Sequence, residues 1–166
     1  ANGATVTVDL GAVANPVFSL SPDAGSSIAL ATPSDIVFGN AIIGEGTVRK
    51  TGTGLLKLTG SNSGHIVVQE GSVQVGNGTA SIRWGGAGSS VTLENGTSLI
   101  IAGNSSGNSH HTIGSDLILG TNASDAVSLK WVDASQANAT NYQHDFTGTV
   151  TVNGAVSLVG RDNWAK

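Results

Sequence analysis

The chain has 166 residues, of which 39% are hydrophobic and only 11% are charged, and its formal net charge at pH 7 is −4. This composition excludes a disordered segment, which needs low hydrophobicity and high net charge. It also excludes a nucleic-acid-binding surface, because the seven basic residues are few and scattered. Cysteine is absent, so no disulfide or thiolate metal site can form. No signal peptide or long apolar stretch is visible, and we expect no membrane insertion by this segment.

Short runs of alternating apolar residues, each closed by Gly or Asn, follow one another along the chain. Such runs are typical of β-strands, whose successive side chains point to opposite faces. No linker divides the chain, so we expect one all-β domain over residues 1–166, with its longest polar loops at 104–111 and 135–142. The expected strands lie within residues 4–10, 65–71, 72–78, 90–96, 98–104, 115–120, 126–132, 148–154 and 155–160, with further strand centres near Val48 and Lys57.

A loose repeat runs through this strand pattern. Its period of about 25 residues is typical of stacked repeats. If each coil stacks on the next at about 4.8 Å, the chain makes a rod about 30 Å long. The three copies are Val68, Gly71, Val73 and Val75; then Leu93, Gly96, Leu99 and Ile101; then Val152, Gly154, Val156 and Leu158.

The most regular part of the chain is the segment 46–78. Its regular positions are Lys50, Thr51, Gly52, Gly54, Leu56, Leu58, Gly60, Asn62, Gly64, Gly71, Val73, Val75 and Gly76. At these positions the segment resembles the autotransporter-associated β-strand repeat, whose pattern runs through a Lys-Thr-Gly turn, Leu-x-Leu, Gly, Asn, a short turn and Gly-x-Leu-x-Val-Gly. It departs from the family in the turn after Asn62, which is shorter and has no aromatic residue.

The resemblance implies a right-handed single-stranded parallel β-helix, or β-solenoid, in the passenger region of a secreted or surface-displayed bacterial protein. An extracellular or cell-surface location follows from the same resemblance. It implies no particular activity, because adhesins, self-associating proteins and enzymes all occur among such passengers.

The alternation within the segment 46–78 predicts which side chains form the core. Lys57 is expected to point outward together with Arg49 or Lys50, as solvated positions that discourage lateral sheet pairing. The predicted repeat core is Leu56, Leu58, Ile66, Val68, Val73 and Val75.

Two stretches carry fragments of catalytic or metal-binding motifs. Residues 103–107 match G-x-S-x-G with Ser105 as the nucleophile, yet no helix follows, as a nucleophile elbow requires. His110, His111 and Asp116 come next, but adjacent histidines on a strand point to opposite faces and no third ligand has zinc-like spacing. The Gly-Gly-Ala-Gly-Ser-Ser stretch at 85–90 has Ser where a calcium-binding β-roll has Asp. We therefore predict a solvated loop at these histidines, no metal, no cofactor and no catalytic residue.

The eleven Asp and Glu residues are dispersed, whereas a glycan-cleaving site needs two carboxylates within about 5 to 10 Å. Only Glu45, Glu70 and Glu94 recur at a spacing close to the repeat, so they could lie above one another. We expect them at solvated turns.

The four largest aromatic residues are candidate surface contacts. An exposed aromatic ring in a polar groove can stack on a sugar, while packing against a coil or covering an end is the alternative role. The candidates are Trp84, Trp131, Tyr142 and Trp164.

Three function classes follow. The first is an extracellular structural or adhesive β-solenoid module that acts as scaffold, adhesin or self-associating fibre subunit, with other copies of itself, adjoining repeats or surface glycans as partners. The second is a glycan-active β-helix enzyme, and the third is a carbohydrate-binding module. The dispersed carboxylates favour the first over the second, and the lack of an aromatic-rich stretch favours it over the third.

Overall fold

The computed structural model describes residues 5–11, 16, 18–76, 83–103, 109–133 and 142–160. Within these ranges the chain forms sixteen strands and no helix. The strands are β1 (Thr5–Asp9), β2 (Ser27–Ala31), β3 (Ile36–Phe38), β4 (Thr47–Thr51), β5 (Leu55–Leu58), β6 (His65–Val68), β7 (Ser72–Val75), β8 (Arg83–Trp84), β9 (Ser90–Leu93), β10 (Ser98–Gly103), β11 (Ser109–Ile113), β12 (Asp116–Leu119), β13 (Ala126–Asp133), β14 (Tyr142–Phe146), β15 (Val150–Val152) and β16 (Ala155–Val159).

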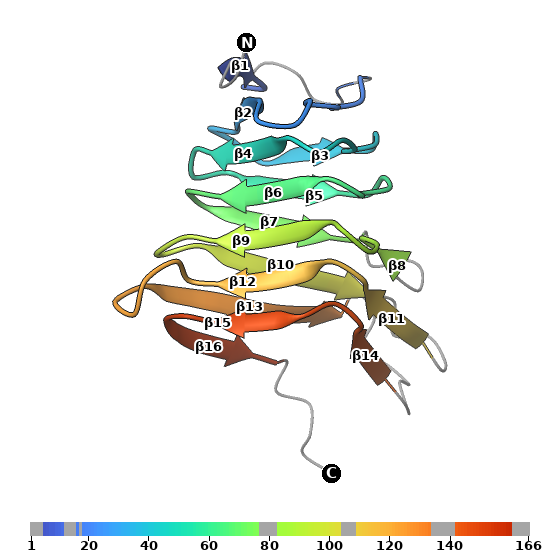
Figure 1. The fold of residues 1–166 in the computed structure, drawn as a ribbon. Helices are drawn as coiled ribbons and strands as arrows, with labels where there is room; N and C mark the ends of the chain where they lie inside the picture. The colour runs from blue at the N-terminus through green and yellow to red at the C-terminus, as the bar shows by residue number, and fades with distance from the viewer. Residues whose placement is uncertain are drawn as a thin grey trace.

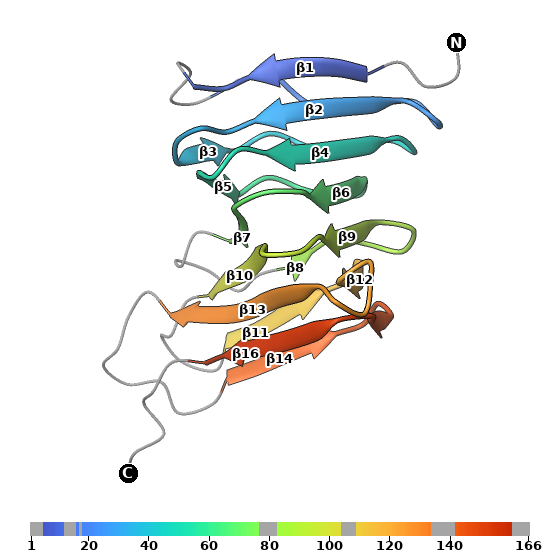
Figure 2. The same cartoon turned by 90° about the vertical axis from the view of Figure 1, so that its left-hand side faces the viewer.

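These strands form three sheets, and every pair of neighbouring strands is parallel (Figures 1 and 2). The seven-stranded sheet has the order β1-β2-β4-β6-β9-β12-β15, the six-stranded sheet β16-β13-β10-β7-β5-β3, and the three-stranded sheet β14-β11-β8. Consecutive strands of the chain therefore belong mostly to different sheets, and each sheet grows in one direction from the N-terminus to the C-terminus. The prediction of an all-β chain is confirmed for the described residues, and the pairing is parallel throughout.

The distance in sequence between stacked neighbours is not constant. Side-chain hydrogen bonds join Gly52 to Glu70, 18 residues apart, and Gln69 to Glu94, 25 residues apart. Toward the C-terminus Asp116 bonds Thr149, 33 residues away. The predicted spacing of about 25 residues thus holds only in the middle of the chain, because the later strands are separated by longer turns and by the added three-stranded sheet.

The register tests the three repeat copies directly. Val68 pairs with Leu93 and Val73 with Leu99, so the first two copies are adjacent strands of the same two sheets. The third copy lies in the same sheets but two strands further on, since β12 and β13 intervene. β12 and β13 form a further copy of the repeat. The repeat pattern in the sequence did not reveal it, because a turn at residues 120–125 separates its two strands.

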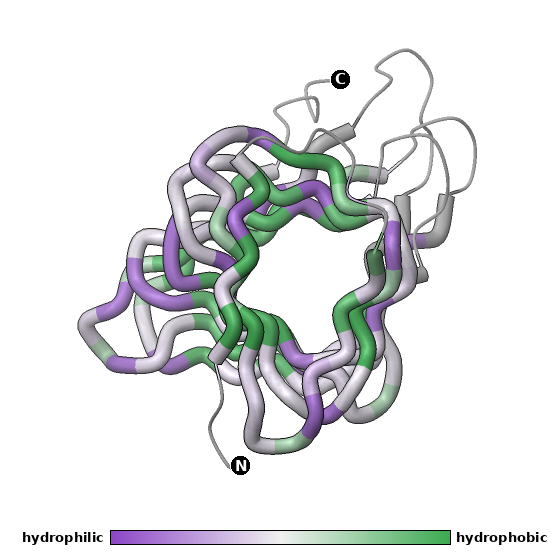
Figure 3. The backbone as a smooth tube through the Cα atoms, turned by 90° about the horizontal axis from the view of Figure 1, so that it is seen from above, coloured by the Kyte–Doolittle hydropathy of each residue, from purple (hydrophilic) through white to green (hydrophobic). Residues whose placement is uncertain are grey.

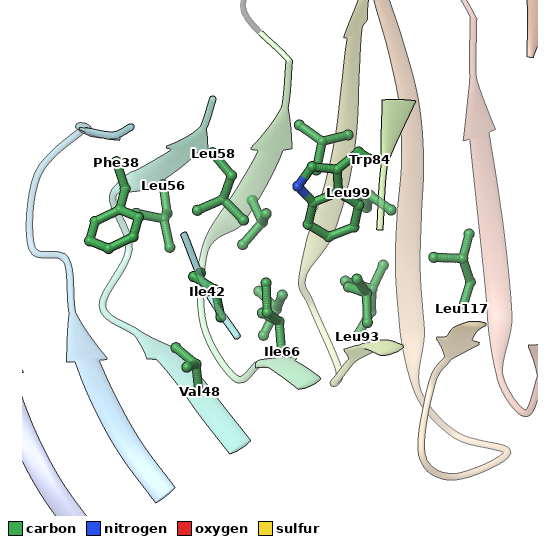
Figure 4. Close-up of a cluster of buried hydrophobic side chains, with 14 of the residues drawn as sticks. Phe38, Ile42, Val48, Leu56, Leu58, Ile66, Trp84, Leu93, Leu99 and Leu117 are labelled. Atoms are coloured by element: carbon green, nitrogen blue, oxygen red, sulfur yellow. The ribbon is translucent and has the colours of Figure 1, made fainter. Parts of the chain in front are cut away.

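Alternating burial builds the core. β5, β6, β7 and β9 each read half-buried, buried, half-buried, buried, as expected for strands with one face inside. The inward side chains stack in columns of like residues (Figure 4), and in the view along the stack the hydrophobic segments of successive strands overlie one another (Figure 3). The six predicted core residues are all buried: Leu56, Leu58, Ile66, Val68, Val73 and Val75.

Five strands have no counterpart in the sequence prediction. β2 and β3 are short and lack a clear alternation, and β8, β11 and β14 are rich in polar or charged residues. The predicted loop at 104–111 is wrong at its end, because β11 begins at Ser109. Parallel pairing to β8 and β14 supplies the backbone hydrogen bonds that make this polar segment a strand.

Candidate functional site

The predicted aromatic surface contacts lie in different environments. Trp84 is 3% exposed and packs in the hydrophobic core (Figure 4), which agrees with the packing role and not with an exposed surface contact, although part of it lines a groove beside the turn 85–88. Trp131 is half-buried and lines an apolar groove at the C-terminal end of the stack. Tyr142 is the first residue of β14, and Trp164 lies outside the described residues.

Lys50 lies inside the stack, contrary to the prediction of a solvated outer position. It is the second buried position of β4 after Val48, and its side chain is 0% exposed. Its Nζ donates hydrogen bonds to the backbone oxygens of Glu70, at 2.8 Å, and Gly52. Burial lowers the pKa of Lys50 to about 8, against the opposing attraction of the Glu70 and Asp35 carboxylates. Arg49, by contrast, is half-buried on the outer face, as predicted, and Lys57 of β5 behaves likewise.

The three glutamates at the repeat-like spacing, which we expected at solvated turns, do not lie above one another. Glu45 precedes a strand, whereas Glu70 and Glu94 follow strands, so Glu45 lies at the opposite edge of the sheet. The register sets Glu94 beside Gln69, whose Nε2 donates to Glu94 Oε1 at 3.2 Å. Glu70 instead accepts a hydrogen bond from the Gly52 amide at 3.0 Å. Each of these two carboxylates is thus held by a turn or side chain of the neighbouring strand.

The histidines predicted in a solvated loop belong to β11. His111 is 1% exposed, and an added Cβ on Gly103 would overlap with its ring, so the loop prediction is wrong for this residue. Ser105 of the G-x-S-x-G match lies outside the described residues. In the part of the chain that the structure describes, no group of three or more His, Asp or Glu side chains is arranged to hold a metal ion.

A groove lies where three successive turns stack, beside the ends of β8, β11 and β14. It has a volume of about 540 Å³ and is open to solvent. Its walls are the glycine-rich turn 85–88, the hydroxyl-bearing residues Thr112, Thr147 and Thr149, and the carboxylate of Asp116. We name it the corner groove. Its polar groups are hydroxyls, backbone amides and one carboxylate, a set that suits an uncharged polyhydroxy ligand.

Close packing of the turns shapes the corner groove. Ser89 Oγ and Ser115 Oγ, both buried, lie 2.6 Å apart and join two of the turns. Gly85 has a φ of 75°, and a Cβ there would overlap with Ser115 Oγ, so no other residue fits. Asp116 is exposed, and its Oδ1 accepts a hydrogen bond from the Thr149 amide at 2.7 Å.

A second, apolar groove of about 350 Å³ lies at the last coil of the stack. In the described part of the chain no further strand follows β15 or β16 in their sheets, and Val152 and Leu158 are 59% and 67% exposed. We name it the C-terminal end face, made of Leu117, Leu119, Leu129, Trp131, Phe146, Val150, Val152, Val156 and Leu158.

Comparison of the chain with protein-family models, with curated proteins and with solved structures finds no significant match. The resemblance of the segment 46–78 to the autotransporter-associated repeat therefore stays a prediction. None of the described residues forms a helix of the length and apolarity that a membrane span needs.

Sequence reasoning missed the buried polar residues. Lys50, Ser89 and Ser115 are buried because the register brings each beside a partner on a neighbouring turn. The only available signal was parity: Lys50 stands two positions after Val48 and therefore on the same face of the strand. Asp116 carried no such signal, because its contact with Thr149 depends on a spacing of 33 residues.

Proposed function

We propose that the chain is a right-handed parallel β-helix, or β-solenoid, that serves as a structural module of a bacterial surface or secreted protein. The observation that carries the proposal is the unbroken parallel order of the seven-stranded sheet, from β1 to β15. Connections between parallel strands of one sheet are right-handed in nearly all proteins, which supports the proposed hand. At about 4.8 Å per strand the stack is roughly 30 Å long, which suits a spacer that holds other parts of a protein away from the cell.

The energetics of such a stack fit a scaffold. Each coil buries its inward column against the coils on either side, as Leu56 does between Ile36 and Val73. Stability is then close to a sum of nearest-neighbour terms, so coils can be added or removed as units. The turns that connect the strands carry the outward residues, and these are free to vary without touching the core.

Deletion of one coil tests the proposed architecture. Because Gln69 lies beside Glu94 in the register, removal of residues 69–93 joins Val68 to Glu94 with the columns unchanged. We expect this variant to fold, with a cooperative thermal transition and unchanged strand content by circular dichroism. The matched control removes residues 69–87, which shifts the columns, and we expect it to be unfolded. Unfolding of both variants would refute the solenoid.

A second experiment tests whether the chain can present an added segment on its surface, as the proposed structural role requires. The turn 121–124 is exposed, so we expect it to accept a short inserted epitope that an antibody binds on the folded chain. Turnover of pectin, glucan or a glycosaminoglycan by the purified chain, abolished by replacing one Asp or Glu, would overturn the structural role in favour of a glycan-active enzyme.

The corner groove supports a second candidate, a carbohydrate-binding module. Its neutral hydroxyls and single carboxylate suit hydrogen bonds to a sugar, and its volume of about 540 Å³ admits a short oligosaccharide. We expect Asp116→Asn to weaken glycan binding measured by calorimetry, while Asp23→Asn, on an exposed turn elsewhere, leaves it unchanged. Absence of heat with a panel of neutral and acidic glycans would remove this candidate.

A further inference from the structure

The two free edges of the seven-stranded sheet have the same sequence. β1 forms one edge and contains Thr-Val-Thr-Val at residues 5–8, and β15 forms the other with Thr-Val-Thr-Val at 149–152. These edges lie at opposite ends of the stack (Figure 1). Among the residues that the structure describes, each edge strand has a hydrogen-bonded neighbour on one side only, β2 and β12 respectively.

The register places the two copies of this sequence in the same columns. Val6 begins the column that continues through Ile28, Val48, Ile66, Val91 and Leu117 and ends at Val150. Val8 begins the next inward column, which ends at Val152 in the same manner. The identical motifs therefore present their valines to the same face and their threonines to the other.

Three of the four valines at the ends of these columns are exposed, and the fourth, Val8, is half-buried. Val6 is 58% exposed at the first strand, and Val150 and Val152 are 45% and 59% exposed at the last. Elsewhere in these columns the inward positions, such as Val48, Ile66 and Val91, are 0% exposed because a strand covers them on each side. A further strand at either edge would bury these valines in the same way, at about 25 cal/mol per Å² of apolar surface.

β15, the last strand of the seven-stranded sheet, also has backbone groups that point away from β12. The Leu117 amide donates to the Thr149 oxygen and the Asn153 amide donates to the Leu119 oxygen, so residues 149 and 153 turn toward β12. By alternation along a strand, the backbone groups of Val150 and Val152 point to the open side. β15 and β16 contain no Lys, Arg or Pro, the residues that commonly block an exposed edge.

We propose that two copies of this chain associate head to tail, with β1 of one copy added in parallel to β15 of the other. The partner strand continues the sheet, and Val6 and Val8 of the second copy lie on Val150 and Val152 of the first. The contact is made by the seven-stranded sheet, because the six-stranded sheet begins one coil later, at β3. The inference rests on the scaffold proposed above and names its partner.

The symmetry of this contact determines which kind of assembly forms. It joins different surfaces of the two copies and is therefore heterologous, so each added copy leaves one free edge at each end. The assembly grows as an open filament and does not stop at a dimer. A contact through one strand is small, so we expect association at concentrations of about 10 μM to 1 mM.

Sedimentation velocity on the full 166-residue chain tests the proposal. We expect the mean sedimentation coefficient to rise continuously with concentration. Val6→Glu and Val150→Lys each place a charge in the contact and should each raise the concentration for half-association at least tenfold. Thr53→Lys, on an exposed turn in the middle of the stack, is the matched control and should associate like the unmodified chain. Circular dichroism checks that each variant is folded.

Mixing the two edge variants identifies the geometry. The Val6→Glu chain keeps an intact β15 edge and the Val150→Lys chain keeps an intact β1 edge, so an equimolar mixture should recover association. Association of two like ends would leave one single variant unaffected, and that result overturns the proposal. Monomers at all concentrations also overturn it. If the deletion of one coil folds while the chain stays monomeric, only the association fails and the scaffold stands.

Discussion

The side chains of Lys50 and Glu70 each form a hydrogen bond to a backbone group in the other residue's segment. Lys50 Nζ donates a hydrogen bond to the backbone oxygen of Glu70 at 2.8 Å, and Glu70 Oε2 accepts one from the amide of Gly52, two residues after Lys50, at 3.0 Å. Lys50 and Glu70 are 20 residues apart in sequence, and Gly52 and Glu70 are 18 apart, so the two hydrogen bonds join β4 to the turn that follows β6. The buried side chain of Lys50, in the Lys-Thr-Gly sequence, thus links two neighbouring segments of the sheet.

Loss of the buried Lys50 side chain and its hydrogen bonds should destabilise the chain. Lys50→Ala removes a fully buried stem and leaves two backbone oxygens without this donor, so we expect the free energy of unfolding to fall by about 2–4 kcal/mol. Lys50→Met keeps most of the stem volume and should lose about 1–2 kcal/mol. Urea denaturation measures both variants. Equal stability of Lys50→Met and the unmodified chain would show that the hydrogen bonds contribute nothing.

The same lysine should make stability depend on pH in the alkaline range. Its pKa is about 8 in the folded chain and 10.5 ordinarily, so between these values the unfolded chain binds more protons. The free energy of unfolding therefore gains a term that rises from pH 8 to about 10.5. We expect the unmodified chain to show this rise relative to Lys50→Met, in thermal or urea denaturation at several pH values. Parallel profiles for the two proteins would contradict the burial of the charge.

Leu55 and Leu56 provide a matched test of the inward column. Both are leucines of β5, but Leu56 is 0% exposed and stacks between Ile36 and Val73, while Leu55 is half-buried on the outer face. We expect Leu56→Ala to cost about 2–5 kcal/mol and Leu55→Ala less than about 1 kcal/mol. Similar losses in urea denaturation would mean that the two faces of the strand are equally buried.

Gly85 and Gly86 test the packing of the corner turns. Gly85 has a positive φ and no room for a Cβ beside Ser115, whereas an added Cβ on Gly86 meets nothing within 4 Å. Gly85→Ala should therefore lose about 2 kcal/mol or more, and Gly86→Ala should be neutral or gain up to about 1 kcal/mol. The shift in melting temperature reports both. A tolerated Gly85→Ala would require the turns to be further apart.

Asp125 should contribute an acid-sensitive term. Its Oδ2 accepts hydrogen bonds from the Thr121 amide, the Thr121 hydroxyl and the Asn122 amide, and these lower its pKa below the ordinary value of 3.8. The stabilisation is present above about pH 4 and is lost as the pH falls through the lowered pKa. We expect Asp125→Asn to reduce the drop in melting temperature between pH 5 and pH 2. An unchanged drop would assign the acid sensitivity to other carboxylates.

The site was less predictable than the core. The alternation of the segment 46–78 identified six residues that are all buried, because side-chain parity is a local property of a strand. The burial of Trp84 and His111 was not predictable, since both belong to the three-stranded sheet, whose strands β8, β11 and β14 pair across long distances in sequence. The corner groove had no local signature at all, because its walls come from three turns far apart in sequence.

The sequence by itself determined the all-β character of the described residues, the inward face of β5, β6 and β7 and the glycine-marked turns, since these depend on residues a few positions apart. Only the tertiary structure decided which strands are neighbours, because the spacing between paired residues changes along the chain, from 17 residues for Leu55 and Ser72 to 33 residues for Leu117 and Val150. That register buries Lys50, joins Ser89 to Ser115, and brings Val6 and Val150 to opposite ends of one column.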